Sequence, residues 1–460
     1  MSIERIMIAA PKSGSGKTSV TLALLQTLKK LNIDTISFKC GPDYIDPLFH
    51  MNVLGIPSFN LDTFFTDEDI TRELFERNSK GHEFALIEGV MGLFDGMGGI
   101  NEEGSSYHLA KVTDTPIILV VDAKGASRSL IPLIAGFKSY DKDNLIKGII
   151  LNRCTKSTFD LLKPLIEETG LKAVGFMSDR KDVNISSRHL GLTTPDDMEG
   201  IREIIDNLTE EFVKNVSIED IKAIANDSDN SYESDNKTEE FDSTDEEIKC
   251  TIAVAKDEAF CFIYEDNLNE FKKYGAKIIY FSPLHDKKIP KDADALLLPG
   301  GYPELHLEDL SNNTSMLESV LNAFKNGMPT VAECGGFMYL HKSIKDSEGK
   351  EFKTVGAIDA KCFYTGKLVR FGYVRIKEKA GSDNGFLPAG SSIKGHEFHY
   401  YDSEQNGDDC TAIKPSTGRE YGCVIEGANY WLGFPHLYYP SETSFARNFV
   451  KKACEFRDIK

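Results

Sequence analysis

The chain has 460 residues, and its 72 Asp and Glu exceed its 53 Lys and Arg, which gives a formal net charge of −19. A chain this acidic is not expected to be a general nucleic-acid or membrane-surface binder. It has no apolar stretch of the roughly 18 residues that a membrane span needs and no secretory signal at its start, and its nine cysteines lack paired spacing, so we expect a cytoplasmic protein with reduced thiols.

The first half of the chain alternates short apolar runs with helix-length segments. The apolar runs lie at residues 5–10, 33–38, 84–89, 116–121, 148–152 and 172–176. Continuous apolar strands separated by helices are typical of a parallel sheet covered on both faces. We therefore predict a first α/β domain over residues 1–205.

A glycine-rich turn follows the first of these strands. The segment APKSGSGKTS, residues 10–19, separates the strand from an amphipathic helix, which is the context of a P-loop. Gly14 and Gly16 would let backbone N–H groups approach phosphate oxygens. Lys17 would reach the β- and γ-phosphates of ATP, and Thr18 would bind Mg²⁺ through its hydroxyl.

Three residues of the predicted nucleotide site allow more than one interpretation. Pro11 stands where the standard P-loop pattern has a glycine. Lys12 is either a second phosphate-binding lysine or a surface residue. Asn152, which ends a later strand, either recognises adenine or is an ordinary turn residue.

Charged side chains follow the next two strands of the predicted sheet. Lys39, Asp43 and Asp46 come after one strand, while Glu88 ends the next and Asp95 follows it. Because ligands bind beyond the carboxyl ends of parallel strands, these groups should gather near the P-loop with Mg²⁺ among them, although any single acid could be a solvated loop residue or a helix cap. The expected metal ligands are Thr18, Asp46 and Glu88, and the expected substrate-binding residues are Lys39, Asp43, Asp46 and Asp95.

An acidic segment joins the two halves of the chain. Residues 226–247 contain ten acidic residues and one lysine, without aliphatic periodicity. Such a segment cannot bury enough apolar surface to offset the loss of chain entropy on folding. We predict a linker over residues 206–248 and a second domain over residues 249–460.

The second half begins with another set of apolar runs, at residues 251–255, 277–281, 295–300 and 329–333. These again predict a mostly parallel sheet with helices on both faces, and β-type segments follow residue 350. The last run leads into Cys334, Gly335 and Gly336 and then a helix. A cysteine on a tight strand-to-helix turn is the arrangement of a nucleophile elbow, and the helix N-terminus is expected to lower the pKa of its thiol.

The predicted nucleophile needs an oxyanion hole and a base. Backbone N–H groups of Gly335 and Gly301 could stabilise the oxyanion. Three histidines, His396, His399 and His436, are candidates for the base, and spacing alone does not rank them.

Several motifs together resemble the cobyrinate a,c-diamide synthase family. They are FKCGPDYIDP (38–47), IEGVMGLFDG (87–96), ECGGFMYL (333–340) and GHEFHY (395–400). The first half is similar to dethiobiotin synthetases and the second to class I glutamine amidotransferases. The resemblance therefore implies a P-loop NTPase-like domain followed by a glutamine amidotransferase-like domain.

What the resemblance implies for function is a ligase that hydrolyses glutamine in its second half. Ammonia would pass to a carboxylate that ATP activates as an acyl phosphate in the first half, at the a and c acetates of cobyrinate in cobalamin biosynthesis. Cys334 would be the nucleophile and His436 the residue that activates it, while His399 would lie near that site. Tyr438 occupies the place where many class I glutaminases have a glutamate, and this branch is known for lacking it.

Two alternative functions remain for such a chain. One is Ni-sirohydrochlorin a,c-diamide synthesis, which uses the same chemistry on another tetrapyrrole. The other is a nucleotide switch whose second half only binds partners, which the intact Gly-Lys-Thr and Cys334 disfavour. The expected partners are the small molecules ATP, glutamine and a tetrapyrrole, with Mg²⁺ as cofactor and a homodimer left open.

Overall fold

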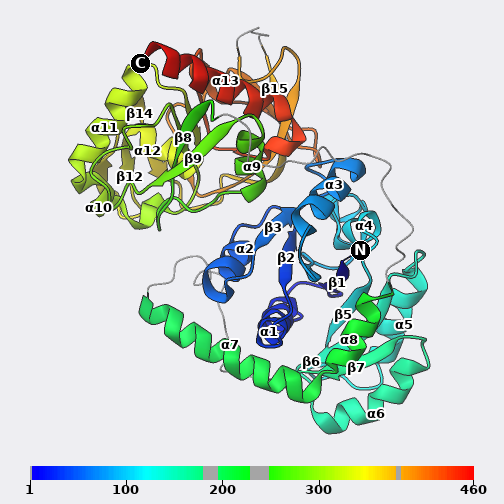
Figure 1. Ribbon diagram of the computed structural model, residues 1–460. Helices are drawn as coiled ribbons and strands as arrows, with labels where there is room; N and C mark the ends of the chain where they lie inside the picture. Colours follow the sequence, from blue (N-terminus) through cyan, green and yellow to red (C-terminus); the bar gives the residue numbers. More distant parts are fainter. Residues whose placement is uncertain (1–2, 180–194, 228–247, 380–384) are drawn as a thin grey trace. The chain divides into compact units, whose positions relative to one another are not determined.

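A computed structural model describes residues 3–179, 195–227, 248–379 and 385–460 (Figure 1). The chain divides into two compact units, Met1–Thr238 and Glu239–Lys460. Each unit contains a mostly parallel sheet with helices packed on it, as the sequence predicts. In the ranges that the structure describes, no helix combines the length and apolar character needed to cross a membrane.

The first unit is built on a seven-stranded sheet in the order β3-β2-β4-β1-β5-β6-β7. All of its strand pairs are parallel, and β1 lies between β4 and β5. Its strands are β1 (Glu4–Ala9), β2 (Thr35–Cys40), β3 (Ser58–Leu61), β4 (Phe84–Glu88), β5 (Ile117–Asp122), β6 (Ile146–Asn152) and β7 (Lys172–Phe176). The sequence did not predict β3, because this edge strand is short and only half apolar.

Helices cover both faces of this sheet. They are α1 (Lys17–Lys30), α2 (Ile45–Phe49) with a π-helical turn (His50–Leu54), α3 (Glu68–Ser79), a 3₁₀ turn (Met97–Gly99), α4 (Ser106–Val112), α5 (Leu130–Tyr140), α6 (Lys156–Glu167), α7 (Pro195–Asn215) and α8 (Ile218–Ala225). On one face, α1, α7 and α8 share a core with alternate residues of the strands. On the other face, Phe75 of α3 packs against Phe38 of β2, with 5.2 Å between ring centroids.

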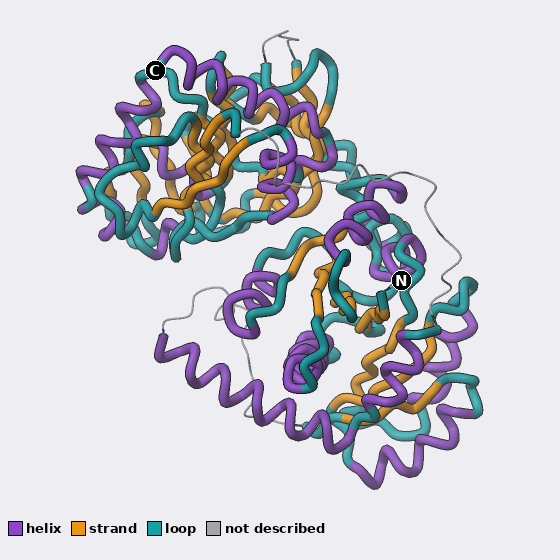
Figure 2. Tube along the Cα trace, in the orientation of Figure 1, coloured by secondary structure: helices purple, strands orange, loops and turns teal. Residues whose placement is uncertain are grey.

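Helices α7 and α8 occupy the start of the region in which a linker was expected. The boundary expected after residue 205 falls inside α7, and residues 206–225 are almost wholly helical. Leu208 and Phe212 are buried at helical spacing in the same core as α1, and Figure 2 shows α7 passing alongside α1. Apolar periodicity thus outweighs the acidic composition here, whereas residues 228–247 of the acidic segment lie outside the described residues.

The second unit contains a six-stranded sheet in the order β20-β21-β11-β10-β8-β9, parallel except for the β20–β21 pair. Its strands are β8 (Cys250–Ala255), β9 (Ala276–Phe281), β10 (Ala295–Leu298), β11 (Thr330–Glu333), β20 (Ile425–Gly427) and β21 (Tyr430–Gly433). Its helical segments are α9 (Glu265–Lys273), a 3₁₀ turn (Pro303–Leu305), α10 (Leu307–Asn312), α11 (Thr314–Lys325), α12 (Gly335–Leu340), a 3₁₀ turn (Tyr439–Ser441) and α13 (Thr443–Ile459).

Two smaller sheets complete the second unit, and their orders are β13-β12-β14-β17 and β19-β18-β15-β16-β22. Their strands are β12 (His341–Lys345), β13 (Glu351–Lys353), β14 (Ile358–Tyr364), β15 (Arg370–Glu378), β16 (Ser392–His399), β17 (Tyr401–Ser403), β18 (Cys410–Ile413), β19 (Glu420–Cys423) and β22 (His436–Leu437). The short strand β22 pairs with β16, so that His436 lies opposite His396.

Candidate active sites

The glycine-rich turn of the first unit has the backbone that a P-loop requires. Gly14 and Gly16 both have left-handed φ angles, of 73° and 98°, which glycine adopts without strain. A Cβ atom at Gly16 would collide with the Asn152 amide, whose Nδ2 donates a hydrogen bond to the Ser15 carbonyl at 2.9 Å. Asn152 therefore supports the P-loop from the end of β6.

A pocket opens beside this turn. It is lined by the P-loop glycines, by the ends of β6 and β7 and by the inner side of α7, through residues that include Gly14, Asn152, Met177, Leu208 and Glu211. The pocket begins at the P-loop and carries both apolar and polar groups, as a nucleotide base and ribose require. The role of Asn152 in adenine recognition remains a prediction.

Two residues at the start of α1 contact the loop and strand next to them. Lys17 donates a hydrogen bond from Nζ to the Met91 carbonyl at 2.6 Å, and burial followed by the nearby Lys39 lowers its pKa. Thr18 donates from Oγ1 to Glu88 Oε1 at 2.7 Å. The Lys17 ammonium therefore lies beside the loop after β4, at the edge of the sheet where phosphates would bind.

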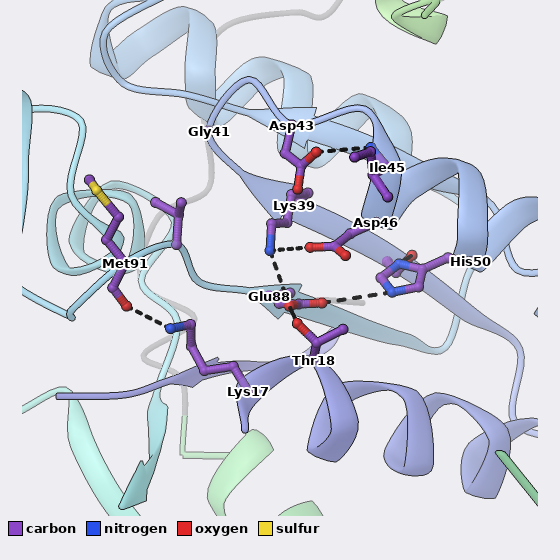
Figure 3. Close-up of polar contacts among 12 residues, drawn as sticks. Lys17, Thr18, Lys39, Gly41, Asp43, Ile45, Asp46, His50, Glu88 and Met91 are labelled. Carbon is purple, nitrogen blue, oxygen red and sulfur yellow. Dashed lines mark hydrogen bonds and ion pairs between the residues drawn. The ribbon is translucent and has the colours of Figure 1, made fainter. Parts of the chain in front are cut away.

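A buried cluster of charges lies at the ends of β2 and β4 (Figure 3). Lys39 Nζ lies 2.5 Å from Asp46 Oδ2 and 3.1 Å from Glu88 Oε1. Burial alone would lower the pKa of Lys39, but Asp46 and Glu88 raise it overall. Burial raises the pKa of Glu88, while the Lys39 ammonium keeps the pKa of Asp46 below its ordinary value against the opposing effect of burial.

Asp43 and His50 flank this cluster. Asp43 Oδ1 accepts a hydrogen bond from the Ile45 N–H at 2.9 Å, and burial together with Asp46 raises its pKa to about 6. His50 is fully buried, and its Nε2 lies 3.8 Å from Glu88 Oε2. His50 is not among the residues predicted from the sequence, although it ends the charged stretch that contains Asp43 and Asp46.

Asp95 lies at the surface, in the loop that follows β4. It is exposed, and its Oδ2 accepts a hydrogen bond from the Gly92 N–H at 2.9 Å. This contact shapes the loop whose Met91 carbonyl accepts from Lys17. Lys12 is also exposed, and the structure leaves its two interpretations open.

The donor set of the first unit fits Mg²⁺. Thr18, Asp46 and Glu88 supply oxygen atoms, and Glu88 Oε2 is buried without a hydrogen-bond partner among the described residues. In the described ranges no three His, Cys, Asp or Glu side chains form a complete metal cage. One or two carboxylates completed by phosphate and water oxygens are what Mg²⁺ ordinarily uses in nucleotide sites.

Cys334 lies on a sharp turn between β11 and α12. Its φ of 46° and ψ of −104° are unusual for a residue with a side chain, as in a strained nucleophile elbow. A Cβ atom at Gly336 would collide with the Leu298 carbonyl, and one at Gly335 would lie 3.2 Å from the Gly301 nitrogen. The turn therefore needs its glycines, and it lies beside the predicted oxyanion donor.

The thiol of Cys334 is buried, with 6% of the residue exposed. Burial, with Glu304 as the next contributor, raises the pKa of the thiol, and the hydrogen bond from the Gly335 backbone opposes this only in part. The expectation of a lowered pKa is therefore wrong for this arrangement, because burial outweighs the six-residue helix α12. A base must remove the proton when the thiol reacts.

The imidazole of His436 packs against the Gly300–Gly301 turn. A Cβ atom at Gly300 would collide with its imidazole, and the His396 ring is stacked on it at 4.9 Å. Burial, followed by the His396 and His399 charges, lowers the pKa of His436 well below its ordinary value. A neutral imidazole is the form that can accept a thiol proton.

The other two candidate histidines make different contacts. His396 Nδ1 lies 3.3 Å from the Tyr264 hydroxyl. His399 Nδ1 lies 2.6 Å from the Tyr401 carbonyl, and its ring stacks on Phe434 at 4.1 Å. Of the three histidines, His436 is the one whose ring packs against the Gly300–Gly301 turn beside Cys334.

Glu397, which lies between His396 and Phe398 in β16, is not among the residues predicted from the sequence. It is fully buried, and Lys414 Nζ lies 3.0 Å and Arg370 Nη1 3.7 Å from its carboxylate oxygens. The Tyr421 hydroxyl also donates to Glu397 Oε2. The glutamate of the GHEFHY motif is visible in the sequence, but its partners lie in β15, in β19 and directly after β18, which only the fold brings together.

Comparison with known proteins agrees with this two-part architecture. Residues 6–270 match the family described as the CobQ/CobB/MinD/ParA nucleotide binding domain, and residues 251–441 match the CobB/CobQ-like glutamine amidotransferase domain. A protein of Fusobacterium nucleatum is 35% identical over 95% of this chain and 98% of its own length. Proteins of Caldanaerobacter subterraneus and Clostridium tetani are 36% identical over 98% of this chain, and over 98% and 100% of their own lengths. All three are named cobyrinate a,c-diamide synthase.

Proposed function

The chain belongs to the cobyrinate a,c-diamide synthase family of glutamine-hydrolysing carbon–nitrogen ligases, and from this premise we propose its reaction. It converts the a and c acetate carboxylates of cobyrinate to amides in cobalamin biosynthesis. ATP activates each carboxylate as an acyl phosphate, and glutamine supplies the nitrogen.

In the first unit, the P-loop backbone and Lys17 bind the phosphates of ATP. A carboxylate oxygen of the substrate attacks the γ-phosphorus, ADP leaves and an acyl phosphate forms. Ammonia then attacks the acyl carbon and inorganic phosphate leaves, which yields the amide. Asp43 and Asp95 orient the substrate beside this site, while Lys39 offsets the charge of Asp46 and Glu88, which would otherwise repel a polycarboxylate.

Mg²⁺ would be held by Thr18, Asp46 and Glu88, and when bound it would neutralise charge on the transferred phosphoryl group. The protein's own contribution is to bury the carboxylates of Asp46 and Glu88 and to place the hydroxyl of Thr18 against Glu88 at the start of α1. The Thr18–Glu88 hydrogen bond at 2.7 Å keeps the two expected ligands together.

In the second unit, the Cys334 sulfur attacks the side-chain amide carbon of glutamine. His436 accepts the thiol proton and returns a proton to the departing ammonia, which leaves a thioester that water hydrolyses to glutamate. Backbone N–H groups of Gly301 and Gly335 stabilise the oxyanion of the tetrahedral intermediate. The neutral imidazole beside a protonated thiol is the starting state that this sequence of steps requires.

The observation that most supports this proposal is the positive-φ cysteine turn beside the Gly301 nitrogen, in a chain that also carries a P-loop with a buried carboxylate at Thr18. Parallel incubations with cobyrinate and with Ni-sirohydrochlorin, each with Mg·ATP and glutamine and followed by mass measurement, test it. We expect two carboxyl-to-amide conversions. Amidation of Ni-sirohydrochlorin in place of cobyrinate would support the alternative substrate, and unchanged tetrapyrroles would contradict both assignments.

A further inference from the structure

The predicted nucleophile and base come from different sheets. Cys334 follows β11 of the six-stranded sheet, whereas His436 begins β22 of the five-stranded sheet. Two residues, Phe434 and Pro435, connect β21 to β22. We call this connection, from Gly433 to Leu437, the crossing between the two sheets. Proton transfer requires the thiol and the imidazole to be held at a fixed distance and orientation, so contacts must fix the position of the crossing.

An orienting carboxylate is missing from the place where many class I glutaminases have one. Position 438 is a tyrosine, and its hydroxyl donates to Asp266 Oδ2 at 3.1 Å. Tyr438 also packs edge-to-face on Tyr264. The side chain at position 438 thus belongs to a contact with α9, and it carries no negative charge that could balance an imidazolium.

Glu333 places a carboxyl group against the crossing, from the end of β11. It ends β11, directly before Cys334, and is 4% exposed. Its Oε2 accepts from the backbone N–H of Leu437 at 3.4 Å, and its Oε1 accepts from the Tyr439 hydroxyl at 2.9 Å. One carboxyl group therefore joins the residue before the nucleophile to the residue after the base.

A second contact fixes the other end of the crossing. The Cys334 N–H donates to the Gly433 carbonyl at 2.9 Å. The connection from Gly433 to Leu437 is thus held at both ends by the consecutive residues Glu333 and Cys334. This arrangement couples the position of His436 to the turn that carries the thiol.

We propose that Glu333 is a positioning residue for glutamine hydrolysis, which fixes His436 against Cys334 through the main chain of β22. It substitutes for the carboxylate that triads place against the imidazole, but it acts on the strand and not on the ring. The inference rests on the proposed glutaminase function of the second unit. Burying a carboxyl group is costly unless it is hydrogen-bonded, and both of its oxygens are.

Two adjacent buried tyrosines offer a matched test. Tyr439→Phe removes the hydroxyl that binds Glu333, and Tyr438→Phe removes a hydroxyl that binds Asp266. We expect Tyr439→Phe to lower kcat for glutamate release by about tenfold with little change in KM, as expected for a small displacement of reacting groups. Tyr438→Phe should keep the wild-type kcat, and ammonia-dependent amide synthesis should be unchanged in both.

Glu333→Ala should give a larger loss, on the order of 100-fold in kcat for glutamate release. Glu333→Gln should lie between Glu333→Ala and wild type, since its carbonyl can still accept from Tyr439 while its amide N–H₂ opposes the Leu437 N–H. If Glu333→Ala does not fold, the tyrosine pair still decides the question. Thermal unfolding of each variant separates loss of structure from loss of position.

The positioning role would be overturned if the two tyrosine variants lost kcat equally, or if each loss of kcat simply followed the drop in that variant's unfolding temperature. A full kcat in Glu333→Ala would overturn it as well. Failure of the wild-type enzyme to release glutamate would instead remove the proposed function itself, and with it this inference. The wild-type measurement therefore distinguishes the two kinds of failure.

Discussion

The two sites use opposite electrostatic designs. In the first unit, the buried ammonium of Lys39 forms ion pairs with the buried carboxylates of Asp46 and Glu88. In the second unit, burial keeps the thiol of Cys334 protonated and the imidazole of His436 neutral. A phosphoryl transfer requires fixed charges, whereas a proton transfer between sulfur and nitrogen requires groups that are neutral before they react.

This difference also explains how each site is held together. The charged cluster lies at adjacent strand ends of one parallel sheet, where β1 and β2 flank β4. The cysteine and histidine come from two sheets, and the contacts of residues 333 and 334 with the crossing between them maintain their register. Three kinds of variant test this comparison. They should affect synthesis from glutamine alone, synthesis from both nitrogen sources, or only the stability of one unit.

The largest expected effect is that of Cys334→Ala. Glutamine-dependent synthesis should fall by at least about 10⁴-fold because the nucleophile is gone, while ammonia-dependent synthesis should remain. Amide formation measured by mass with each nitrogen source checks this. Cys410→Ala, at a fully buried cysteine elsewhere in the second unit, is the control and should retain both activities.

Lys17→Ala should lower synthesis from both nitrogen sources by about 10³-fold, because a lost charge contact to the phosphates affects the activation step that they share. Steady-state rates with glutamine and with ammonium chloride measure this. Lys156→Ala, which removes an exposed pair with Asp160, should leave both rates unchanged. A selective loss with glutamine alone would contradict the assignment of Lys17.

Glu397→Gln should destabilise the second unit by about 3 kcal/mol, because it leaves the cations around a buried carboxylate unpaired. The single tryptophan, Trp431, lies in the core of that unit, so its fluorescence during urea unfolding reports on the effect. An unchanged unfolding midpoint would show that Glu397 does not hold the strands together.

The stability difference between wild type and Glu397→Gln should also depend on pH. Burial alone would raise the pKa of Glu397, but the neighbouring His399 and Lys414, with Tyr421 and Arg370, lower it to about 2. The stabilisation should be fully present above the ordinary glutamate pKa of about 4.3 and should be lost as the pH falls towards the folded-state value. The difference between wild type and Glu397→Gln should therefore shrink below that pH, and a constant difference would contradict it.

The smallest expected effect is that of Asn152→Ala. Loss of one hydrogen bond of about 1 kcal/mol to the P-loop should raise the KM for ATP about fivefold and leave kcat nearly unchanged. Initial rates over a range of ATP concentrations measure this. Asn226→Ala, at an exposed residue whose side chain donates to the Lys222 carbonyl in the preceding helix turn, should not change the KM.

Much of the fold could be predicted because the central strands are continuous apolar runs. All ten predicted strands are present in the two large sheets. The strands after residue 350 could not be ordered, since antiparallel pairing such as that of β15 with β16 depends on partners set by the whole unit. The predicted start of the linker falls within α7, where many acidic residues surround a helical repeat of buried residues such as Leu208 and Phe212.

The candidate sites divide in the same way. The cluster of Lys39, Asp46 and Glu88 follows from sheet geometry, because neighbouring parallel strands end at one edge. The contact of Glu333 with Leu437 joins residues far apart in sequence and in different sheets. Neither the spacing nor the chemistry of either residue points to the other, so only the folded chain could show it.

A double-isotope experiment tests the central claim that one chain joins carboxylate activation to glutamine hydrolysis. The wild-type enzyme is given cobyrinate labelled with ¹⁸O in its carboxyl groups, together with Mg·ATP and glutamine labelled with ¹⁵N in its side-chain amide. The account predicts a ¹⁵N atom in each new amide and one ¹⁸O atom transferred to inorganic phosphate for each amide formed. Amide product accompanied by unlabelled phosphate, or amide without ¹⁵N, would contradict it.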